Sequence, residues 1–199
     1  MYLTEENIDL NPFKQFDIWF KEAKDIGLKD PNAMNIASAT KDGVPSSRMV
    51  LLKSYDEKGF VFYTNYTSRK SQEIIDNPKV ALNFFWDALE RQVRVEGDIS
   101  KVGSKISDEY FSSRSRLSQL GAHASNQSQI IQSYDVITNK LSELEKKYEG
   151  KEIPRPDHWG GFIIVPKTIE FWQGHEGRIH DRLKFQKENS GWNLVRLSP

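Results

Sequence analysis

Short apolar runs separated by tight turns fill the first hundred residues, and their spacing constrains the fold more than any other feature. Strand-like runs lie at residues 34–40, 46–53, 60–65, 80–86 and 91–99, with the turns K-D-G and D-E-K-G between the first three. Runs this short, joined by glycine-containing turns, favour antiparallel hairpins. Five of them in succession predict a small β-barrel.

Helical patterns flank and interrupt these strands. Asn11 before Pro12 is typical of a capped helix start, and apolar residues then recur at helical spacing until Gly27. Thr67 or Ser68 can cap a second helix, which we expect to run through Ile75. The remaining pattern predicts polar helices at 107–114 and 129–148, strands at 161–172 and 178–186, and one more strand from W-N-L-V-R-L.

These elements predict a mainly β protein with flanking helices, of the α+β class. We expect residues 1–199 to form a single domain, with a helical segment at 1–30 and C-terminal strands within 161–199. The N-terminal sequence has neither a basic region nor an apolar stretch, and no window approaches the roughly 18 apolar residues of a membrane span. The sequence therefore predicts a soluble, cytoplasmic protein without a membrane partner.

Composition excludes several kinds of chemistry. The chain contains 28 basic and 28 acidic residues, so its overall charge gives no reason to expect nucleic acid as a partner. It contains no cysteine, which excludes disulfides, thiolate metal sites and a thiol nucleophile. The segment H-E-G-R-I-H places His175 and His180 five residues apart, whereas the zinc protease pattern needs four. We predict no metal site.

The segment from Ile169 to Arg182 is unusually rich in ionisable residues for a strand region. It contains two arginines, two histidines, three acids and a tryptophan. A buried charge without a partner costs several kcal/mol, so a strand that only fills a core has no use for this composition. We expect a charged ligand to bind near this segment.

A second candidate site lies at the start of the helix after Y-T-N-Y-T. Ser68, Arg69 and Lys70 combine free backbone N–H groups, the positive end of a helix dipole and two cations. Such a set suits a phosphate group. The alternative is an ordinary capped helix with a basic first turn.

Further polar residues extend the pattern. Tyr110, Arg114 and Ser118 follow one another at i, i+4 steps and would present three donors to a second phosphate if one helix continued that far. Arg48 and Lys53 flank M-V-L-L on a strand and point to opposite faces, so they serve two neighbouring ligands or are solvated charges at the strand ends. The groups that can read the edge of a heteroaromatic ring are Gln92, Gln127 and Ser128.

Taken together, these motifs resemble the pyridoxine (pyridoxamine) 5'-phosphate oxidase family. The resemblance rests on R-M-V-L-L-K, F-Y-T-N with S-R-K, the 110/114/118 series, Q-S at 127–128 and, above all, F-W-Q-G-x-x-x-R-I-H-D-R. It implies an FMN-binding split β-barrel that forms a homodimer, with FMN in clefts at the subunit interface. It also implies oxidation of pyridoxine 5'-phosphate or pyridoxamine 5'-phosphate to pyridoxal 5'-phosphate, with O2 as acceptor and release of H2O2.

The resemblance also assigns roles to residues. Arg178 and His180 would be catalytic, with Arg178 covering the substrate and His180 assisting. The substrate site would comprise Lys53, Tyr110, Arg114, Ser118, Arg178 and His180. The FMN site would comprise Arg48, Met49, Val50, Leu51, Leu52, Lys53, Tyr63, Thr64, Arg69, Lys70, Gln92, Gln127, Ser128, Trp172 and Arg182.

Two alternatives share part of this pattern. A split-barrel flavin reductase or flavin-storage protein would keep the FMN residues and lack the substrate set, and a non-catalytic carrier of pyridoxal phosphate would hold the product without turnover. His123 and Ala124 depart from the bulkier apolar pair of many family members. His123 is expected at the surface or in an interface.

Overall fold

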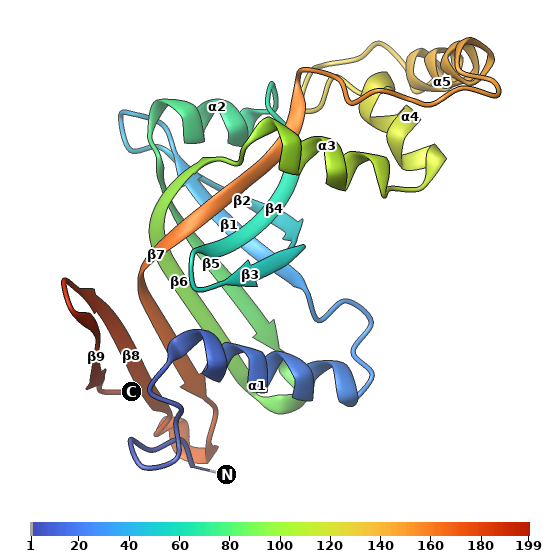
Figure 1. Cartoon of the computed structure of the whole chain (residues 1–199). Helices are drawn as coiled ribbons and strands as arrows, with labels where there is room; N and C mark the ends of the chain where they lie inside the picture. Colours follow the sequence, from blue (N-terminus) through green and yellow to red (C-terminus); the bar gives the residue numbers. More distant parts are fainter. Residues whose placement is uncertain (1) are drawn as a thin grey trace.

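One antiparallel sheet forms the centre of the computed structural model, which describes residues 2–199. Its neighbouring strands follow the order β2-β1-β5-β6-β7-β4-β3, with β8 on β7 and β9 on β8. Figure 1 shows the sheet curling on itself, so the predicted barrel is confirmed. Within the described residues the strands are β1 Ala33–Ala39, β2 Pro45–Leu51, β3 Ser54–Asp56, β4 Gly59–Asn65, β5 Lys79–Trp86, β6 Arg91–Lys101, β7 Trp159–Gln173, β8 Asp181–Glu188 and β9 Gly191–Arg196.

Strand β7 changes partner midway, and this splits the sheet into a barrel and an arm. Its first half pairs with β4 and its second half with β8, while β6 runs along nearly its whole length. The change falls at a bulge where Gly97 faces Pro166. A Cβ at Gly97 would lie 2.2 Å from the carbonyl oxygen of Val165, so only glycine fits this close approach.

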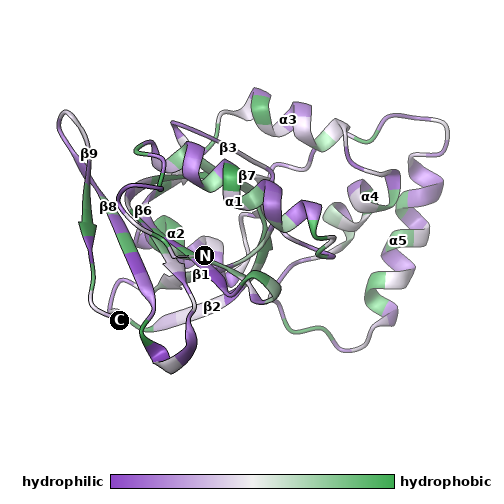
Figure 2. Cartoon of the chain, turned by 90° about the horizontal axis from the view of Figure 1, so that it is seen from below, coloured by the Kyte–Doolittle hydropathy of each residue, from purple (hydrophilic) through white to green (hydrophobic). Residues whose placement is uncertain are grey.

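Helices cover the outside of the barrel, which confirms the mainly β class with flanking helices. They are α1 Pro12–Asp25, α2 Arg69–Asp76, α3 Ser104–Ser112, α4 Arg116–Ala124 and α5 Asp135–Lys147, with short 3-10 turns η1 Asp87–Leu89 and η2 Glu176–Arg178. Figure 2 shows α4 and α5 on the side of the barrel opposite to β8 and β9. No helix within residues 2–199 is long and apolar enough to cross a membrane.

Helix α1 begins where the sequence predicts and closes one end of the barrel. The side chain of Asn11 accepts a hydrogen bond from the N–H of Phe13 at 3.0 Å, which is the expected cap. Phe16 and Phe20 then enter the core, where Phe16 packs edge-on against Phe60 at a ring distance of 5.1 Å. The 3.6-residue spacing of these apolar side chains is therefore the reason that the helix packs here.

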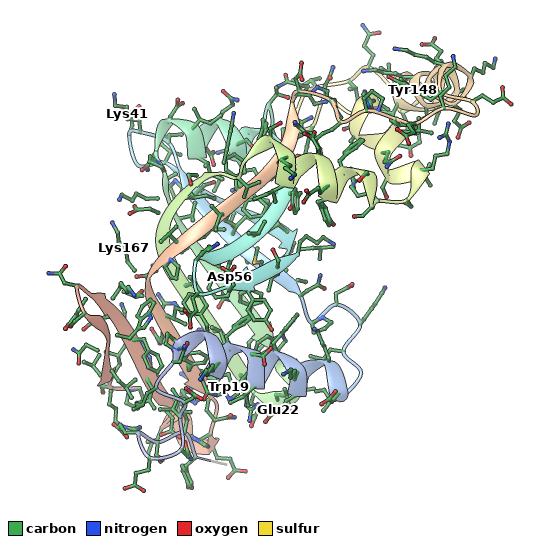
Figure 3. The ribbon with its side chains drawn as sticks, viewed as in Figure 1. Trp19, Glu22, Lys41, Asp56, Tyr148 and Lys167 are labelled. Carbon is green, nitrogen blue, oxygen red and sulfur yellow. The ribbon has the colours of Figure 1, made fainter. Side chains whose placement is uncertain are left out.

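Arg91 joins α1 to the sheet through an ion pair and a cation–π contact. Arg91, the first residue of β6, forms an ion pair with Glu22. Its guanidinium also lies 4.5 Å from the ring centroid of Trp19. Figure 3 labels Trp19 and Glu22 on this helix, next to the end of the sheet.

Several predicted boundaries are wrong. The chain breaks between α3 and α4, where Ser115 caps a new helix, so Tyr110, Arg114 and Ser118 do not share one helix face. Helix α5 begins at Asp135 rather than at 129, because the preceding residues form turns. Strand β8 begins at Asp181 rather than at 178, because η2 occupies residues 176–178.

Candidate active site

A cavity of about 650 Å³ opens between β2, β4, the start of β7 and helices α2 to α4. The helices that line it, α2, α3 and α4, lie at the end of the barrel away from α1, near the top of Figure 1. A cavity of this size suits a small-molecule ligand. Its walls are formed by Met49, Val50, Leu51, Lys53, Tyr63, Thr64, Asn65, Lys70, Tyr110, Arg114, Ser115, Ser118, Gly121, Ala122, Ser125, Gln127 and Trp159.

The charge of the cavity wall is strongly one-sided. Lys53, Lys70 and Arg114 line it, and no aspartate or glutamate does so within residues 2–199. The chain as a whole carries equal numbers of basic and acidic residues, so this excess is local. Three cations around one concave space attract an anionic ligand.

Arg114 is the least satisfied of these cations. Its guanidinium lies 4.6 Å from the ring centroid of Trp159, and its Nη1 atom is buried without a hydrogen-bond partner in the part of the chain that the structure describes. Burial lowers the pKa of Arg114, an effect that Tyr110 partly opposes. A buried donor without a partner costs about 1–3 kcal/mol, so this arginine is arranged for a ligand that the chain itself does not supply.

An aromatic stack supports Arg114. The rings of Tyr63 and Tyr110 lie 3.9 Å apart at an interplanar angle of 17°. Trp159 continues the stack at 5.5 Å from Tyr63. Burial raises the pKa of Tyr63, with a smaller contribution from Tyr110. The stack therefore presents the neutral phenol of Tyr63 beside the cations. It brings together residues from β4, α3 and β7.

Among the described residues Lys70 has only neutral partners. Its Nζ atom donates to the side-chain oxygen of Gln127 at 2.8 Å and to the hydroxyl of Ser68 at 3.2 Å. The hydroxyl of Thr64 donates to the same Gln127 oxygen at 3.2 Å. Burial, followed by the nearby charge of Arg48, lowers the pKa of Lys70 to about 8. A phosphate at this position would supply the negative charge that the ammonium lacks.

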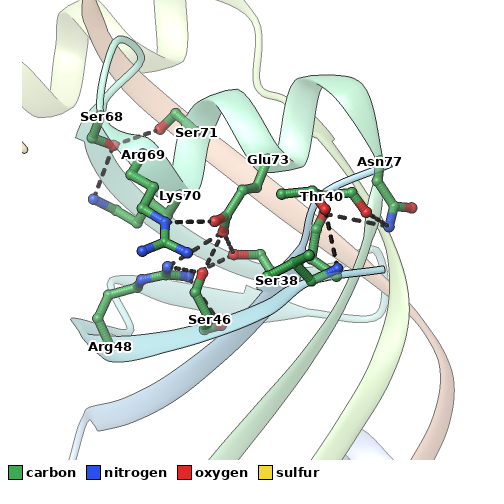
Figure 4. Close-up of polar contacts among 12 residues, drawn as sticks. Ser38, Thr40, Ser46, Arg48, Ser68, Arg69, Lys70, Ser71, Glu73 and Asn77 are labelled. Atoms are coloured by element: carbon green, nitrogen blue, oxygen red, sulfur yellow. Dashed lines mark hydrogen bonds and ion pairs between the residues drawn. The ribbon is translucent and has the colours of Figure 1, made fainter. Parts of the chain in front are cut away.

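Arg48 and Arg69 lie outside the cavity wall and share one buried carboxylate. Glu73, whose side chain is 4% exposed, pairs with Arg69 Nε at 2.9 Å and with Arg48 Nη2 at 3.3 Å. It also accepts from the hydroxyl of Ser38 at 2.6 Å, and Figure 4 shows this cluster. Burial alone would raise the pKa of Glu73, but the hydroxyls of Ser38 and Ser46 and both arginines lower it to about 2. Because one carboxylate faces two guanidinium groups, this layer behind Lys70 keeps one net positive charge.

A second group of predicted site residues lies on the C-terminal arm. Gln92 on β6, Trp172 on β7 and Arg182 on β8 face one another across the strands in one row. Arg182 donates from Nε to Glu170 at 2.8 Å. The ring of His180 lies 4.7 Å from that of Trp172. These residues form one contiguous surface that ends in the η2 loop.

The η2 loop carries Arg178 in a rare backbone conformation. Its φ is 61°, next to Gly177 at 70°. Ser128, another predicted contact, has φ 71°. A residue other than glycine with positive φ is uncommon, and such residues occur often at functional sites. Arg178 is exposed, which leaves its guanidinium accessible to a ligand.

The predicted residues therefore divide into two groups at the two ends of β7. Trp159 and Trp172 mark the ends and lie thirteen residues apart, or about 40 Å along the strand at roughly 3.3 Å per residue. The cavity group comprises Met49, Val50, Leu51, Lys53, Tyr63, Thr64, Lys70, Tyr110, Arg114, Ser118 and Gln127. The arm group comprises Gln92, Trp172, Arg178, His180 and Arg182. Arg48, Leu52, Arg69 and Ser128 belong to neither group, and Leu52 is buried in the core.

Sequence reasoning missed part of the cavity wall. The missed residues are Asn65, Ser115, Gly121, Ala122, Ser125 and Trp159. Most belong to α4 or its ends, and α4 was not expected. Asn65 could have been singled out because it follows Thr64 in the same polar strand end, and its amide donates to the carbonyl of Ser125 at 3.2 Å. Within residues 2–199 no cluster of histidine and acidic side chains is arranged to hold a metal ion.

A curled sheet that forks at β7, with helices on its outside, defines the split β-barrel class, and two family models match this chain. Residues 20–148 match the pyridoxamine 5'-phosphate oxidase model. Residues 159–199 match a model described as the pyridoxine 5'-phosphate oxidase C-terminal dimerisation region. The chain belongs to the pyridoxamine 5'-phosphate oxidase family.

Individual relatives agree with the family models. The pyridoxine/pyridoxamine 5'-phosphate oxidase of Trichormus variabilis is 54% identical over 198 residues, covering 99% of this chain and 92% of the relative. The protein of that name from Rubrobacter xylanophilus is 54% identical over 197 residues, covering 99% and 91%. Among solved structures, PhzG from Burkholderia lata, in complex with tetrahydrophenazine-1-carboxylic acid, superimposes with a TM-score of 0.93 at 26% identity, covering 99% of this chain and 98% of that chain.

Proposed function

We propose that this protein is an FMN-dependent oxidase that converts pyridoxine 5'-phosphate or pyridoxamine 5'-phosphate to pyridoxal 5'-phosphate. O2 is the proposed acceptor, with release of H2O2 and, from the amine, ammonia. Family membership supports this reaction. The structural observation that carries the proposal is the cavity, which among the described residues is lined by three cations and no acid and contains the unpartnered Nη1 of Arg114.

The cavity residues suit two phosphate groups. We assign Lys70, in the first turn of α2, and Gln127, in the turn after α4, to the phosphate of FMN. Arg48 and Arg69 add positive charge behind them. Lys53, Arg114 and the hydroxyls of Tyr110 and Ser118 would hold the substrate phosphate. When bound, FMN would accept the hydride from the C4' carbon of the substrate. The residues of the chain anchor both phosphates and so orient the two reacting rings.

We further propose that the site is completed by a second copy of the chain. The arm group lies about 40 Å from the cavity along β7, so it is too remote to act on a ligand there within one subunit. The match of residues 159–199 to a dimerisation region supports a homodimer. Arg178 of the partner subunit and His180 of the partner subunit would then cover the substrate, with FMN at the interface.

The outer face of the sheet supports this arrangement. Met49 and Leu51 on β2 and Phe85 on β5 are large apolar side chains that are 61%, 42% and 56% exposed. Met49 and Leu51 also line the cavity. Exposed apolar residues gathered beside a ligand site are typical of a surface that another protein covers.

An anaerobic spectrum of the FMN-loaded protein tests the function. Addition of pyridoxine 5'-phosphate should bleach the flavin, and readmitted oxygen should restore its colour with release of peroxide. In air, pyridoxamine 5'-phosphate should drive oxygen uptake, whereas unphosphorylated pyridoxamine should not. A flavin that stays oxidised with both phosphorylated vitamers would contradict the proposed reaction. Equal turnover with and without the phosphate would remove the assigned roles of Lys53, Arg114 and Ser118.

A further inference from the structure

The loop that carries Arg178 and His180 is closed at its base by a pair of side chains outside the predicted site. His175 Nε2 and Asp181 Oδ2 lie 2.6 Å apart. The backbone N–H of His175 also donates to Nδ1 of His180 at 3.1 Å. Residues 175 and 181 therefore bracket the loop, and one of them contacts His180 directly.

The contact to His180 selects one form of its ring. Because Nδ1 accepts a hydrogen bond, it carries no hydrogen in this arrangement, so in the neutral ring the hydrogen is on Nε2. The ring of His180 also packs against the ring of Trp172, and the two centroids are 4.7 Å apart. His180 is thus held as a donor of defined orientation.

The N-terminal segment contacts both His175 and Asp181. The N–H of Leu3 donates to Asp181 Oδ2 at 2.9 Å, and the ring of Tyr2 lies 4.7 Å from that of His175. Leu3 is 5% exposed, so the segment is anchored in the core. Residues 2–5 therefore form a strap over the base of the loop.

Arg196 on β9 joins the strap to Asp181. It donates to Asp181 Oδ1 at 3.0 Å and to the carbonyl of Leu3 at 3.1 Å, and it pairs with Glu5 at 2.7 Å. Burial alone would raise the pKa of Asp181, but the hydrogen bonds from His175, Leu3 and Arg196 lower it. The carboxylate of Asp181 is therefore kept charged at the centre of the network.

We propose that His175 and Asp181, held by the strap of residues 2–5, are positioning residues for the loop that presents Arg178 and His180. The positive φ of Arg178 is costly for a residue with a Cβ and needs support from outside the loop, which this network provides. This inference rests on the proposed function, which assigns Arg178 and His180 of the loop to the substrate. The contacts themselves do not depend on it.

Two variants separate the parts of this network. His175→Phe keeps an aromatic ring against Tyr2 and loses the bond to Asp181, whereas the amide nitrogen of His175→Gln can still donate to Asp181. Lys167→Ala is the matched control, because it removes an ion pair to Asp98 elsewhere on β7. Figure 3 labels Lys167, which lies away from the η2 loop.

The expected result is a selective loss. His175→Phe should lower kcat with pyridoxamine 5'-phosphate about tenfold, since small misplacements of a positioning group have effects of this order or larger. The affinity for FMN and the melting temperature should stay close to those of the unmodified protein. His175→Gln should recover kcat to within about threefold, and Lys167→Ala should change nothing.

Hydrogen exchange provides a readout that does not need activity. Amides of residues 174–181 should exchange at least about tenfold faster in His175→Phe than in the unmodified protein, and not in Lys167→Ala. Unchanged exchange, or unchanged kcat in an active protein, would overturn the inference. So would an equal loss of kcat, FMN affinity and melting temperature in both His175 variants. An unmodified protein without oxidase activity but with the exchange difference would contradict the proposed function and leave the strap intact.

Discussion

The two ends of β7 differ in whether their positively charged side chains have acidic partners. At the cavity, Lys70 and Arg114 have no acidic partner among residues 2–199, and within the same residues Arg114 has a buried donor atom without any partner. On the arm, Arg182 pairs with Glu170, and Arg196 pairs with Asp181. The cavity cations are therefore available to a ligand, whereas the paired arginines of the arm, Arg182 and Arg196, stabilise its structure. Arginine at the two ends should therefore respond differently to substitution.

The largest effect is expected at Arg114. Arg114→Met should lower kcat/KM with pyridoxamine 5'-phosphate about 100-fold, because a charge-assisted hydrogen bond contributes roughly 1.5–3 kcal/mol. The melting temperature of the ligand-free protein should not fall, since the substitution removes a buried donor without a partner. Steady-state oxygen uptake and a thermal melt measure the two quantities. A large loss of stability with normal activity would reverse the comparison.

At Arg182 we expect the larger effect of substitution on stability. Glu170 is 4% exposed and pairs with Arg182 at 2.8 Å and with Arg94 at 3.4 Å. Arg182→Met leaves this buried carboxylate with the longer contact alone, and we expect a loss of about 2 kcal/mol in the free energy of unfolding. In a protein of this size that corresponds to a fall of roughly 4–8 °C in melting temperature. An unchanged melt would show that the arm does not depend on its ion pairs.

The pH dependence of FMN binding sharpens the comparison at Lys70. Its pKa of about 8 in the ligand-free chain means that the ammonium loses its proton above that pH. The FMN phosphate is a dianion there, so its affinity should fall by about tenfold between pH 7 and 9.5. Flavin fluorescence titrations measure this change. Lys70→Met should bind more weakly at pH 7 and show a flat profile, and a flat profile in the unmodified protein would contradict the assignment.

The same shift predicts the sign of a stability change. Lys70 has a lower pKa in the folded chain than its ordinary value of 10.5, so the unfolded chain binds more protons between about pH 8 and 10.5. The contribution of Lys70 to stability therefore rises with pH across this window. Comparing denaturant midpoints of the ligand-free protein and Lys70→Met over that range tests the sign. A contribution that falls with pH would mean that Lys70 has an acidic partner.

The smallest effect is expected at a surface pair that belongs to neither end. Lys79 pairs with Asp98, and the two side chains are 61% and 43% exposed. Lys79→Ala should change the free energy of unfolding by less than about 1 kcal/mol and leave turnover unchanged. A measurable change in turnover would mean that charged residues far from the cavity also affect catalysis. That result would weaken the contrast between the two ends.

Elements held by contacts between residues close in the sequence were predictable, whereas those held by contacts between distant residues were not. The strands of the first hundred residues and the cap of α1 were predictable because alternation, turn glycines and Asn11 are local signals. Helix α4 was missed because only two of its nine residues, Leu120 and Ala124, are buried, which leaves a weak apolar pattern in the sequence. The fork of β7 was missed because it depends on β4 pairing with a strand about a hundred residues later.

The site was predictable in its members and not in their grouping. Arg114, Lys53 and Gln127 stand far apart in the sequence, and the structure brings them to one cavity. Sequence spacing carries no information on the order of strands in a sheet, so the separation of Trp172 from the cavity was not foreseen. The role of Glu73 was also missed. Its i, i+4 spacing from Arg69 is a sequence signal for an ion pair, but its contact with Arg48 on β2 joins distant parts of the sequence and has none.

Mixed dimers test most directly whether a site combines the two ends of β7 from different subunits. Arg114→Ala and Arg178→Ala chains, carrying different tags, are co-expressed, and the mixed dimer is purified through both tags. If the cavity of one subunit works with the arm of the other, one of its two sites is unmodified, so about half of normal activity returns although each parent dimer is nearly inactive. A mixed dimer as inactive as its parents would contradict the account, because each site would then be built within one chain.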